Sequence, residues 1–172
     1  FPQILFIKNK SNLGVTKSFN NAIKFAEGEF IIDLAADDIL LSNCVQTQLE
    51  TFKKSELNNL AIVFGNAELI SENGTHISYY FDVDSNLKTI NKRTIGDIYA
   101  EVISDKKVIC SVSAMVKKSV FHALNGYDET LSYEDLDFWI RVSRLYNIDF
   151  IDGVLVQKRI VSNSLHTTFF KP

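Results

Sequence analysis

Two adjacent aspartates, Asp37 and Asp38, follow residues 30–34, which we predict to form a buried strand. In an open α/β sheet, ligands bind beyond the carboxyl ends of the strands, where these aspartates would lie. Two crowded carboxylates attract a cation, and a hard cation such as Mg²⁺ or Mn²⁺ takes one or two of them together with substrate phosphates. Alternatively, one aspartate caps the helix that follows, which is worth about 1 kcal/mol. Spacing alone leaves both interpretations open.

A second group of carboxylates lies between Asp128 and Asp137. Three of them, Glu134, Asp135 and Asp137, stand in the first turn of an aromatic-rich helix predicted over 134–146. Acids in a first turn interact well with the helix dipole, at about 0.3–1 kcal/mol each. One carboxylate aimed into a cleft could instead act as a general base. The residues by themselves favour the structural role.

A third candidate is the loop before the first predicted helix, which contains Asn12 and Gly14. Backbone amides at a helix start can face an anion. The same Asn-x-Gly spacing is also ordinary turn chemistry.

The elements that must position these groups follow from hydrophobic periodicity. Helices are predicted over 16–26, from about 42 to 52, and over 94–105, 118–124 and 134–146. Strands are predicted over 4–7, 30–34, 60–70, 76–81, 112–116, 148–151 and 154–160, with a hairpin turn at 72–74. Strands that alternate with helices favour an α/β fold with a mixed, mostly parallel sheet flanked by helices.

Composition narrows the class of protein. The chain has 172 residues, is 46% hydrophobic and has a formal net charge of −3, which fits one folded domain. Its basic residues are scattered, so we do not expect nucleic acid as a partner. No apolar run is long enough to span a membrane. Cys44 and Cys110 are far apart, which predicts reduced thiols in a cytoplasmic protein.

Four stretches, in order, resemble the family-2 glycosyltransferases of GT-A fold, and a fifth does so more weakly. Their family patterns are N-x-G-x-x-x-A-R-N-x-G-x-x-x-A-x-G-E-Y-I, D-x-D-D, G-G-F-D-E, E-D-x-D-x-W-x-R and Y-R-x-H-x-x-S. The corresponding residues are 12–31, 35–38, 125–129, 134–141 and 158–164.

The resemblance implies an inverting glycosyltransferase that uses a nucleotide-diphosphate sugar and Mg²⁺ or Mn²⁺. It implies that Asp37 holds the metal and that Asp135 is the catalytic base. It further implies donor-binding residues (Asn12, Gly14, Asn20 and Asp38) and acceptor-side residues (Gly126, Asp128, Glu134 and Asp137). Residues 1–112 would form the donor and metal side of one GT-A-like domain, and residues 113–172 its acceptor side.

The family also implies a setting: a saccharide or lipid-linked acceptor in bacterial polysaccharide or glycoconjugate synthesis, in the cytoplasm or at the inner face of the membrane. The family's first strands, with their nucleotide-gripping D-D-G-S motif, have no counterpart here, so we expect an N-terminally truncated domain. The uncovered apolar face would then favour a homodimer paired through residues 4–7.

Four positions depart from the family patterns: Phe19 replaces arginine, Ala22 glycine, Ala35 aspartate and Val161 histidine. They leave an alternative open, which is a non-catalytic sugar- or partner-binding relative that kept the fold.

Overall fold

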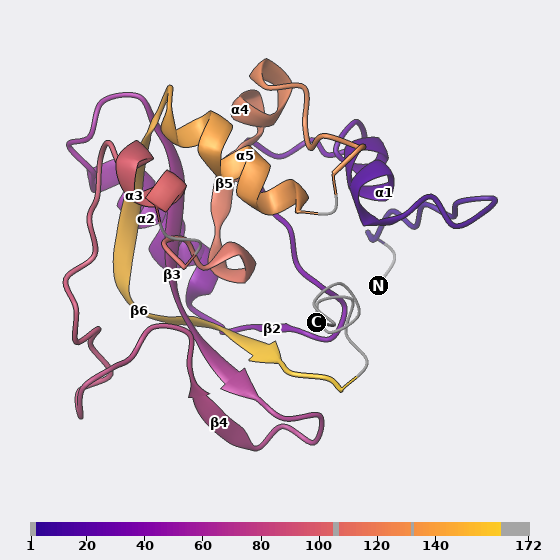
Figure 1. Cartoon of the computed structure of the whole chain (residues 1–172). Coiled ribbons are helices and arrows are strands. Elements are labelled where there is room, and N and C mark those ends of the chain that lie inside the picture. The colour runs from indigo at the N-terminus through magenta and orange to yellow at the C-terminus, as the bar shows by residue number, and fades with distance from the viewer. Residues whose placement is uncertain (1–2, 105–106, 132, 163–172) are drawn as a thin grey trace.

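The computed structural model describes residues 3–104, 107–131 and 133–162. Its helices are α1 (Val15–Ala22), α2 (Cys44–Lys54), α3 (Tyr99–Ser104), α4 (Lys118–Ala123) and α5 (Glu134–Ser143), with a 3-10 turn, η1 (Ser111–Ser113). Its strands are β1 (Phe30–Ile32), β2 (Ile39–Leu40), β3 (Leu60–Ile70), β4 (His76–Tyr79), β5 (Met115–Lys117) and β6 (Asn147–Arg159) (Figure 1).

The strands form one sheet in the order β1-β5-β3-β6-β2, with β4 paired to β3. The predicted mixed sheet is confirmed, but the expectation of mostly parallel strands is wrong. Among the described strands only β3 and β6 are parallel, and every other pair is antiparallel. Two strands that are joined by a helix are parallel only if the connection carries the chain back to the end of the sheet where the first strand began. Here β5 instead enters in the opposite direction, between β1 and β3.

Strands β3 and β6 are the centre of the core. Residues 60–67 of β3 are all buried, as expected for a strand covered on both faces. Gly65 has no room for a side chain, because a Cβ atom there would lie 2.6 Å from Cδ1 of Leu155. The two strands predicted over 148–151 and 154–160 are one strand, whose pairing with β3 shifts register near Gly65.

Helix α2 packs on β3 and β6. It begins after Asn43, as predicted, and buries Cys44 and Gln48. Gln48 Nε2 donates hydrogen bonds to the carbonyl oxygens of Val63 (3.2 Å) and Ser113 (2.7 Å). These bonds satisfy a buried polar side chain and tie α2 to the sheet and to η1.

Helices α1 and α3 are shorter than predicted. In α1 the chain leaves the helix after Ala22 and continues as a turn. The start of α3 is set by Gly96, whose φ is 87° and which pairs with Ile148, and by Asp97, whose Oδ1 accepts the N–H of Tyr99. A helix cannot run through a left-handed residue that pairs with a strand, so the predicted start at residue 94 is wrong.

Four aromatic rings join α1 to α4 and α5. The ring of Phe19 lies 5.1 Å from that of Phe121 and 4.6 Å from that of Tyr127, and Phe121 stacks on Phe138 at 4.4 Å. This cluster anchors α1 beside the start of α5, away from the strands (Figure 1).

The strand predicted over residues 4–7 is absent. This segment runs out along the edge of the molecule, where residues Ile4, Leu5 and Phe6 are 69%, 64% and 81% exposed. An extended segment becomes a strand only when a neighbour accepts and donates its hydrogen bonds, and no described strand lies beside it.

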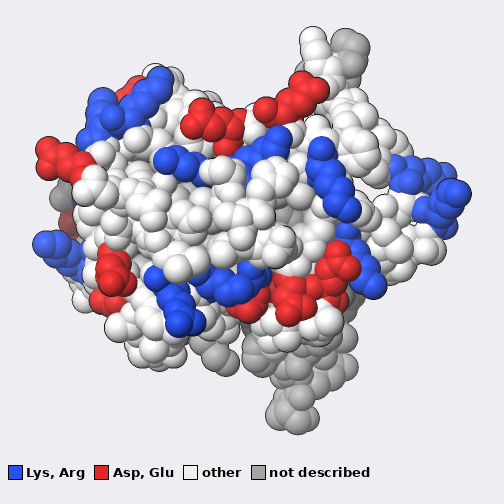
Figure 2. Space-filling model, turned by 90° about the horizontal axis from the view of Figure 1, so that it is seen from above, with Lys and Arg blue, Asp and Glu red and all other residues white. Residues whose placement is uncertain are grey.

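Within the described part of the chain, no helix is long and apolar enough to cross a membrane. On the face seen from above, Lys and Arg lie in separate groups among Asp, Glu and uncharged residues (Figure 2).

Candidate active site

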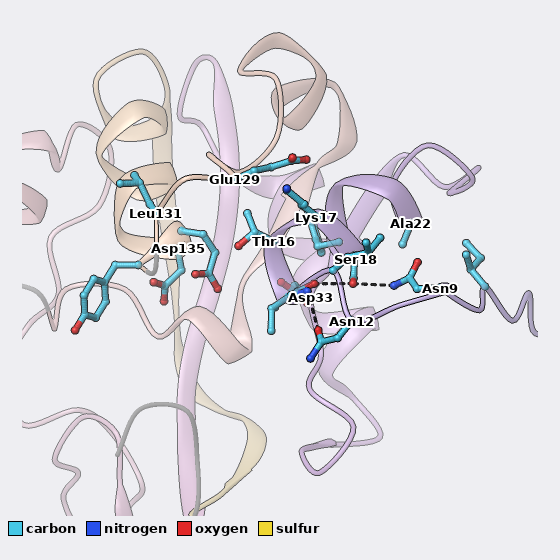
Figure 3. Close-up of a pocket in the computed structure, with 17 residues that line it drawn as sticks. Asn9, Asn12, Thr16, Lys17, Ser18, Ala22, Asp33, Glu129, Leu131 and Asp135 are labelled. Atoms are coloured by element: carbon cyan, nitrogen blue, oxygen red, sulfur yellow. Dashed lines mark hydrogen bonds between the residues drawn. The ribbon is translucent and has the colours of Figure 1, made fainter. Parts of the chain in front are cut away.

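A cleft of about 1070 Å³ lies between α1 and the start of α5 (Figure 3). One side is α1 with the loop before it, and the other is the segment from Glu129 into the first turn of α5. The lining residues are Ile7, Asn9, residues 12–19, Ala22, Asp33, Glu129, Leu131 and residues 133–135. Polar side chains and apolar surface are mixed in it, as in most small-molecule sites.

The α1 side is shaped by the turn at Gly14, whose φ is 78°. Asn12 Oδ1 accepts the N–H of Gly14 at 2.9 Å, and Ser18 Oγ donates to the Gly14 carbonyl at 2.6 Å. Asn9 Nδ2 donates in turn to Ser18 Oγ at 2.9 Å. The predicted donor-binding residues Asn12 and Gly14 therefore both line the cleft.

The α5 side presents Glu134 and Asp135, both half-buried. Asp135 Oδ2 accepts a hydrogen bond from Ser111 Oγ at 2.9 Å, and its Oδ1 accepts the N–H of Leu136 at 2.8 Å. Burial raises the pKa of Glu134, and the nearby charges of Asp135 and Asp33 raise it further. Asp135, the predicted base, and Glu134, a predicted acceptor-side residue, thus line the same cleft.

Asp33 is a cleft residue that sequence reasoning missed. It follows β1, and its Oδ2 accepts a hydrogen bond from the Tyr127 hydroxyl at 3.3 Å. Desolvation by the cleft walls raises the pKa of Asp33, the Tyr127 hydrogen bond opposes this, and the charge of Asp135 adds to it. The signal was a carboxylate inside a stretch predicted to be a buried strand, because a charge is rarely placed there without a partner or a function.

Asp37 and Asp38 lie outside the cleft lining, on the turn between β1 and β2. Asp38 Oδ1 accepts the backbone N–H of Arg159 at 2.8 Å, and Arg159 Nε donates to the Asp37 carbonyl at 3.1 Å. The Asp37 side chain is exposed. The alternative that one of them caps the next helix is wrong, because β2 follows them and Asn43 precedes α2.

These two carboxylates offer a cation only a partial set of ligands. No group of three His, Cys, Asp or Glu side chains that could hold a metal occurs among the described residues. Mg²⁺ commonly binds through one or two carboxylates and completes its shell with phosphates and water. The pair therefore fits a cation that arrives with a diphosphate, rather than one held by the protein alone.

Asn20 and Gly126 hold the loop before α5 in place. The Asn20 carboxamide accepts the N–H of Tyr127 (3.0 Å) and donates to the Tyr127 carbonyl (2.8 Å) and to Glu129 Oε1 (3.2 Å). Gly126 has a φ of 71°, and a Cβ atom there would collide with the Asn20 side chain. Neither residue lines the cleft, so their predicted donor and acceptor contacts gain no support from the geometry.

Asp128 and Asp137 are also engaged within the protein. Asp128 Oδ1 accepts the N–H (2.9 Å) and hydroxyl (2.7 Å) of Thr130, and these bonds lower the Asp128 pKa. Asp137 forms an ion pair with Arg141 at 2.6 Å. Arg141 also donates to the carbonyls of Leu124 and Gly126. Of the four predicted acceptor-side residues, only Glu134 lines the cleft.

Comparison with known proteins identifies the family. The model of the family described as "Glycosyl transferase family 2" matches residues 1–124, which is well over half of the chain. The chain belongs to this family. The matched residues end before α5, so this match does not extend to Asp135.

Curated relatives are glycosyltransferases too. An uncharacterized glycosyltransferase of Methanocaldococcus jannaschii is 31% identical over 92% of this chain and 51% of its own length. One from Rickettsia felis is 30% identical over 90% of this chain and 25% of its own length. The chain thus spans about half the length of these relatives or less. Over 41% of the chain it is 34% identical to the Escherichia coli enzyme UDP-Glc:alpha-D-GlcNAc-diphosphoundecaprenol beta-1,3-glucosyltransferase WfgD, covering 27% of that protein.

The fold is similar to that of S. aureus TarS, solved in complex with UDP-GlcNAc. The two superpose with a TM-score of 0.63 at 16% identity, over 90% of this chain and 41% of the solved TarS chain, which comprises residues 1–349 of that protein. This likeness confirms the predicted GT-A-like fold.

Proposed function

We propose that this chain is the part of an inverting glycosyltransferase that moves a sugar from a nucleotide-diphosphate sugar to an acceptor hydroxyl. The observation that carries the proposal is the place of Asp135, which lines the same cleft as Asn12 and Gly14. Membership in glycosyl transferase family 2 supports it. A carboxylate at one wall of a cleft and a sharp glycine turn at the other suit a hydroxyl acceptor and a charged donor, respectively.

In the proposed reaction, the acceptor oxygen attacks the anomeric carbon from the face opposite the diphosphate. Asp135 takes the hydroxyl proton as the new C–O bond forms, and the bond from the sugar to the diphosphate breaks. The diphosphate leaves with the bonding electrons, so the configuration at that carbon is inverted. A positioned general base is typically worth about 10²- to 10⁴-fold in rate.

Asp37 would hold the Mg²⁺ or Mn²⁺ that accompanies the donor, with Asp38 beside it at the donor ribose or sugar. Such a cation, when bound, stabilises negative charge on a leaving diphosphate. Arg159 supports this role for the turn, because its side chain and backbone fix residues 37 and 38 against the end of β6. In this proposal residues 1–112 supply the donor and metal side and residues 113–172 the acceptor side.

Uridine diphosphate sugars are the first donors to test. TarS was solved with UDP-GlcNAc, and WfgD is named for UDP-glucose and a diphosphoundecaprenol-linked acceptor. By analogy, the acceptor of this protein is a saccharide or a lipid-linked saccharide in bacterial polysaccharide or glycoconjugate synthesis.

The test is Asp135→Asn in the full-length protein that contains this chain, with release of UDP from UDP-glucose and from UDP-GlcNAc measured with Mn²⁺ and with EDTA. We expect kcat to fall by at least ~10²-fold with little change in KM, because the amide keeps the shape but cannot take the proton. Chelation of the metal should lower turnover of the parent protein.

Glu50→Gln is the control for this experiment, because it removes one exposed carboxylate on α2, outside the cleft. It should leave turnover unchanged. Wild-type turnover in Asp135→Asn would reject Asp135 as the base.

The second candidate is a relative that binds sugar nucleotides without turning them over. It is favoured by Phe19, which stands where the family has arginine and whose ring packs on Phe121 and Tyr127. An aromatic side chain therefore occupies the position of the family's arginine, although Lys17 also lines the cleft. Thermal stabilisation by UDP-GlcNAc without UDP release would select this candidate.

A further inference from the structure

The Asp135 carboxylate is part of a chain of hydrogen bonds that starts at Trp139, the one tryptophan within residues 1–172. Trp139 Nε1 donates to Ser111 Oγ at 3.0 Å, and Ser111 Oγ donates to Asp135 Oδ2 at 2.9 Å. Trp139 is 5% exposed and lies one helical turn after Asp135 in α5, whereas Ser111 begins η1, 24 residues before Asp135. The Ser111–Asp135 bond therefore links the cleft to η1, which is distant from α5 in the sequence.

The direction of this chain follows from elementary chemistry. An indole N–H can only donate a hydrogen bond, so Ser111 Oγ must be the acceptor of the Trp139 contact. A serine hydroxyl has one hydrogen, and an ionised carboxylate can only accept. The Ser111 hydrogen is therefore directed at Asp135 Oδ2, in a charge-assisted bond that is stronger than a neutral one.

The bond restricts the Asp135 side chain. Its Oδ1 accepts the N–H of Leu136, which is the next residue in the same helix, so this contact moves together with Asp135. The Ser111 bond comes from outside α5 and fixes the carboxylate relative to the rest of the fold. Each carboxylate oxygen keeps a further lone pair that can accept a hydrogen bond.

We propose that Ser111, oriented by Trp139, is a positioning residue that holds the Asp135 carboxylate at the angle needed to take the proton from the acceptor. This inference rests on the proposed function of Asp135 as the base. Small displacements of a reacting group can cost about 10²-fold in rate, so a positioning bond of this kind affects the chemical step.

Trp139 provides a test that does not require turnover, because its indole N–H resonance in a ¹⁵N–¹H NMR spectrum, assigned by its loss in Trp139→Phe, reports the bond to Ser111 directly. Ser111→Ala should move this resonance and speed exchange of the indole proton with solvent. Asp135→Asn should also move it, since hydrogen bonds in a chain polarise one another. That second shift should be much smaller in the Ser111→Ala background. Equal shifts in both backgrounds, or an indole resonance unchanged by Ser111→Ala, would overturn the inference.

A kinetic test uses the full-length protein and UDP release from UDP-glucose and UDP-GlcNAc. Ser111→Ala should lower kcat about tenfold or more with little change in KM, and it should have no further effect in the Asp135→Asn background. Ser111→Thr keeps the hydroxyl and should restore most of the lost rate.

Ser113→Ala is the matched control, because Ser113 lies in the same turn but its Oγ lies within hydrogen-bond distance of the carbonyl oxygens of Gly65 (2.7 Å) and Cys110 (2.8 Å), which share its one hydrogen, and not of Asp135. It should reduce stability and leave kcat near wild type. If Ser111→Ala and Ser113→Ala lost kcat equally, Ser111 would have only a structural role. If neither the parent nor any variant released UDP, that result would contradict the proposed function. The NMR measurement would still show whether the hydrogen-bond chain exists.

Discussion

At the scale of single residues, the cleft brings Asp33, Glu134 and Asp135 close enough for their charges to interact. Like charges in a partly desolvated site disfavour ionisation, and the pKa of Asp33 and that of Glu134 are both raised. Tyr127 is the one described hydrogen-bond partner of the Asp33 side chain that opposes this effect. A substrate whose hydroxyl groups donate hydrogen bonds to these carboxylates would oppose the rise in their pKa, because such bonds stabilise the ionised form.

The raised pKa of Asp33 predicts how stability depends on pH. An acid whose folded pKa is above its unfolded value contributes stability at low pH that is lost as pH rises through the folded pKa. Asp33→Asn removes this loss, so the variant should unfold at a higher temperature than the parent at pH 7. The difference should shrink toward pH 4, near the usual aspartate pKa of about 3.9. Thermal unfolding followed by circular dichroism across this range measures it, and a difference independent of pH would contradict the assignment.

At the scale of elements, the loop between α4 and α5 is held from both sides. Asn20 of α1 bonds to Tyr127 in this loop, and Arg141 of α5 bonds to the carbonyls of Leu124 and Gly126. The Asp137 ion pair keeps Arg141 in place. The residues that the family motif places here therefore fix the relative position of α1 and α5, which are the two sides of the cleft.

Gly126→Ala tests this arrangement. It should lower the free energy of unfolding by about 2–4 kcal/mol, because it adds both left-handed strain and a clash with Asn20. Gly74→Ala is the matched control: Gly74 also has a positive φ, of 85°, but no atom lies near its missing Cβ. The free energy of unfolding of Gly74→Ala should fall only by the contribution of left-handed backbone strain, about 1–2 kcal/mol. Urea unfolding compares the two, and equal losses would show that the Asn20 contact relaxes freely.

At the scale of the whole molecule, the apolar segment over residues 4–7 lies outside the sheet, and β1 is a terminal strand of the described sheet. Exposed apolar segments and open strand edges both favour contact with another chain. The cleft borders this segment through Ile7 and Asn9. Of residues 4–7, only Ile7 is among the residues that line the cleft.

We expect residues 1–172 by themselves to self-associate as the concentration rises. Phe6→Asp should weaken the association by placing a charge in the apolar segment, whereas Phe25→Asp, at an exposed position outside that segment, should not. Sedimentation velocity over a range of concentrations measures both. A protein that stays monomeric throughout would contradict the expectation.

The sequence by itself determined the family, the hairpin of β3 and β4, the start of α2 and the place of Asp135 at the start of α5. These features depend on local periodicity, turn residues and the order of motifs, which are properties of neighbouring residues. Only the tertiary structure decided the direction of the strands, the presence of Asp33 in the cleft and the tie between Asn20 and Tyr127. Asn20 and Tyr127 are 107 residues apart, and Ser111 and Asp135 are 24 apart. Such contacts arise when packing brings distant segments together, and no pattern within one segment specifies them.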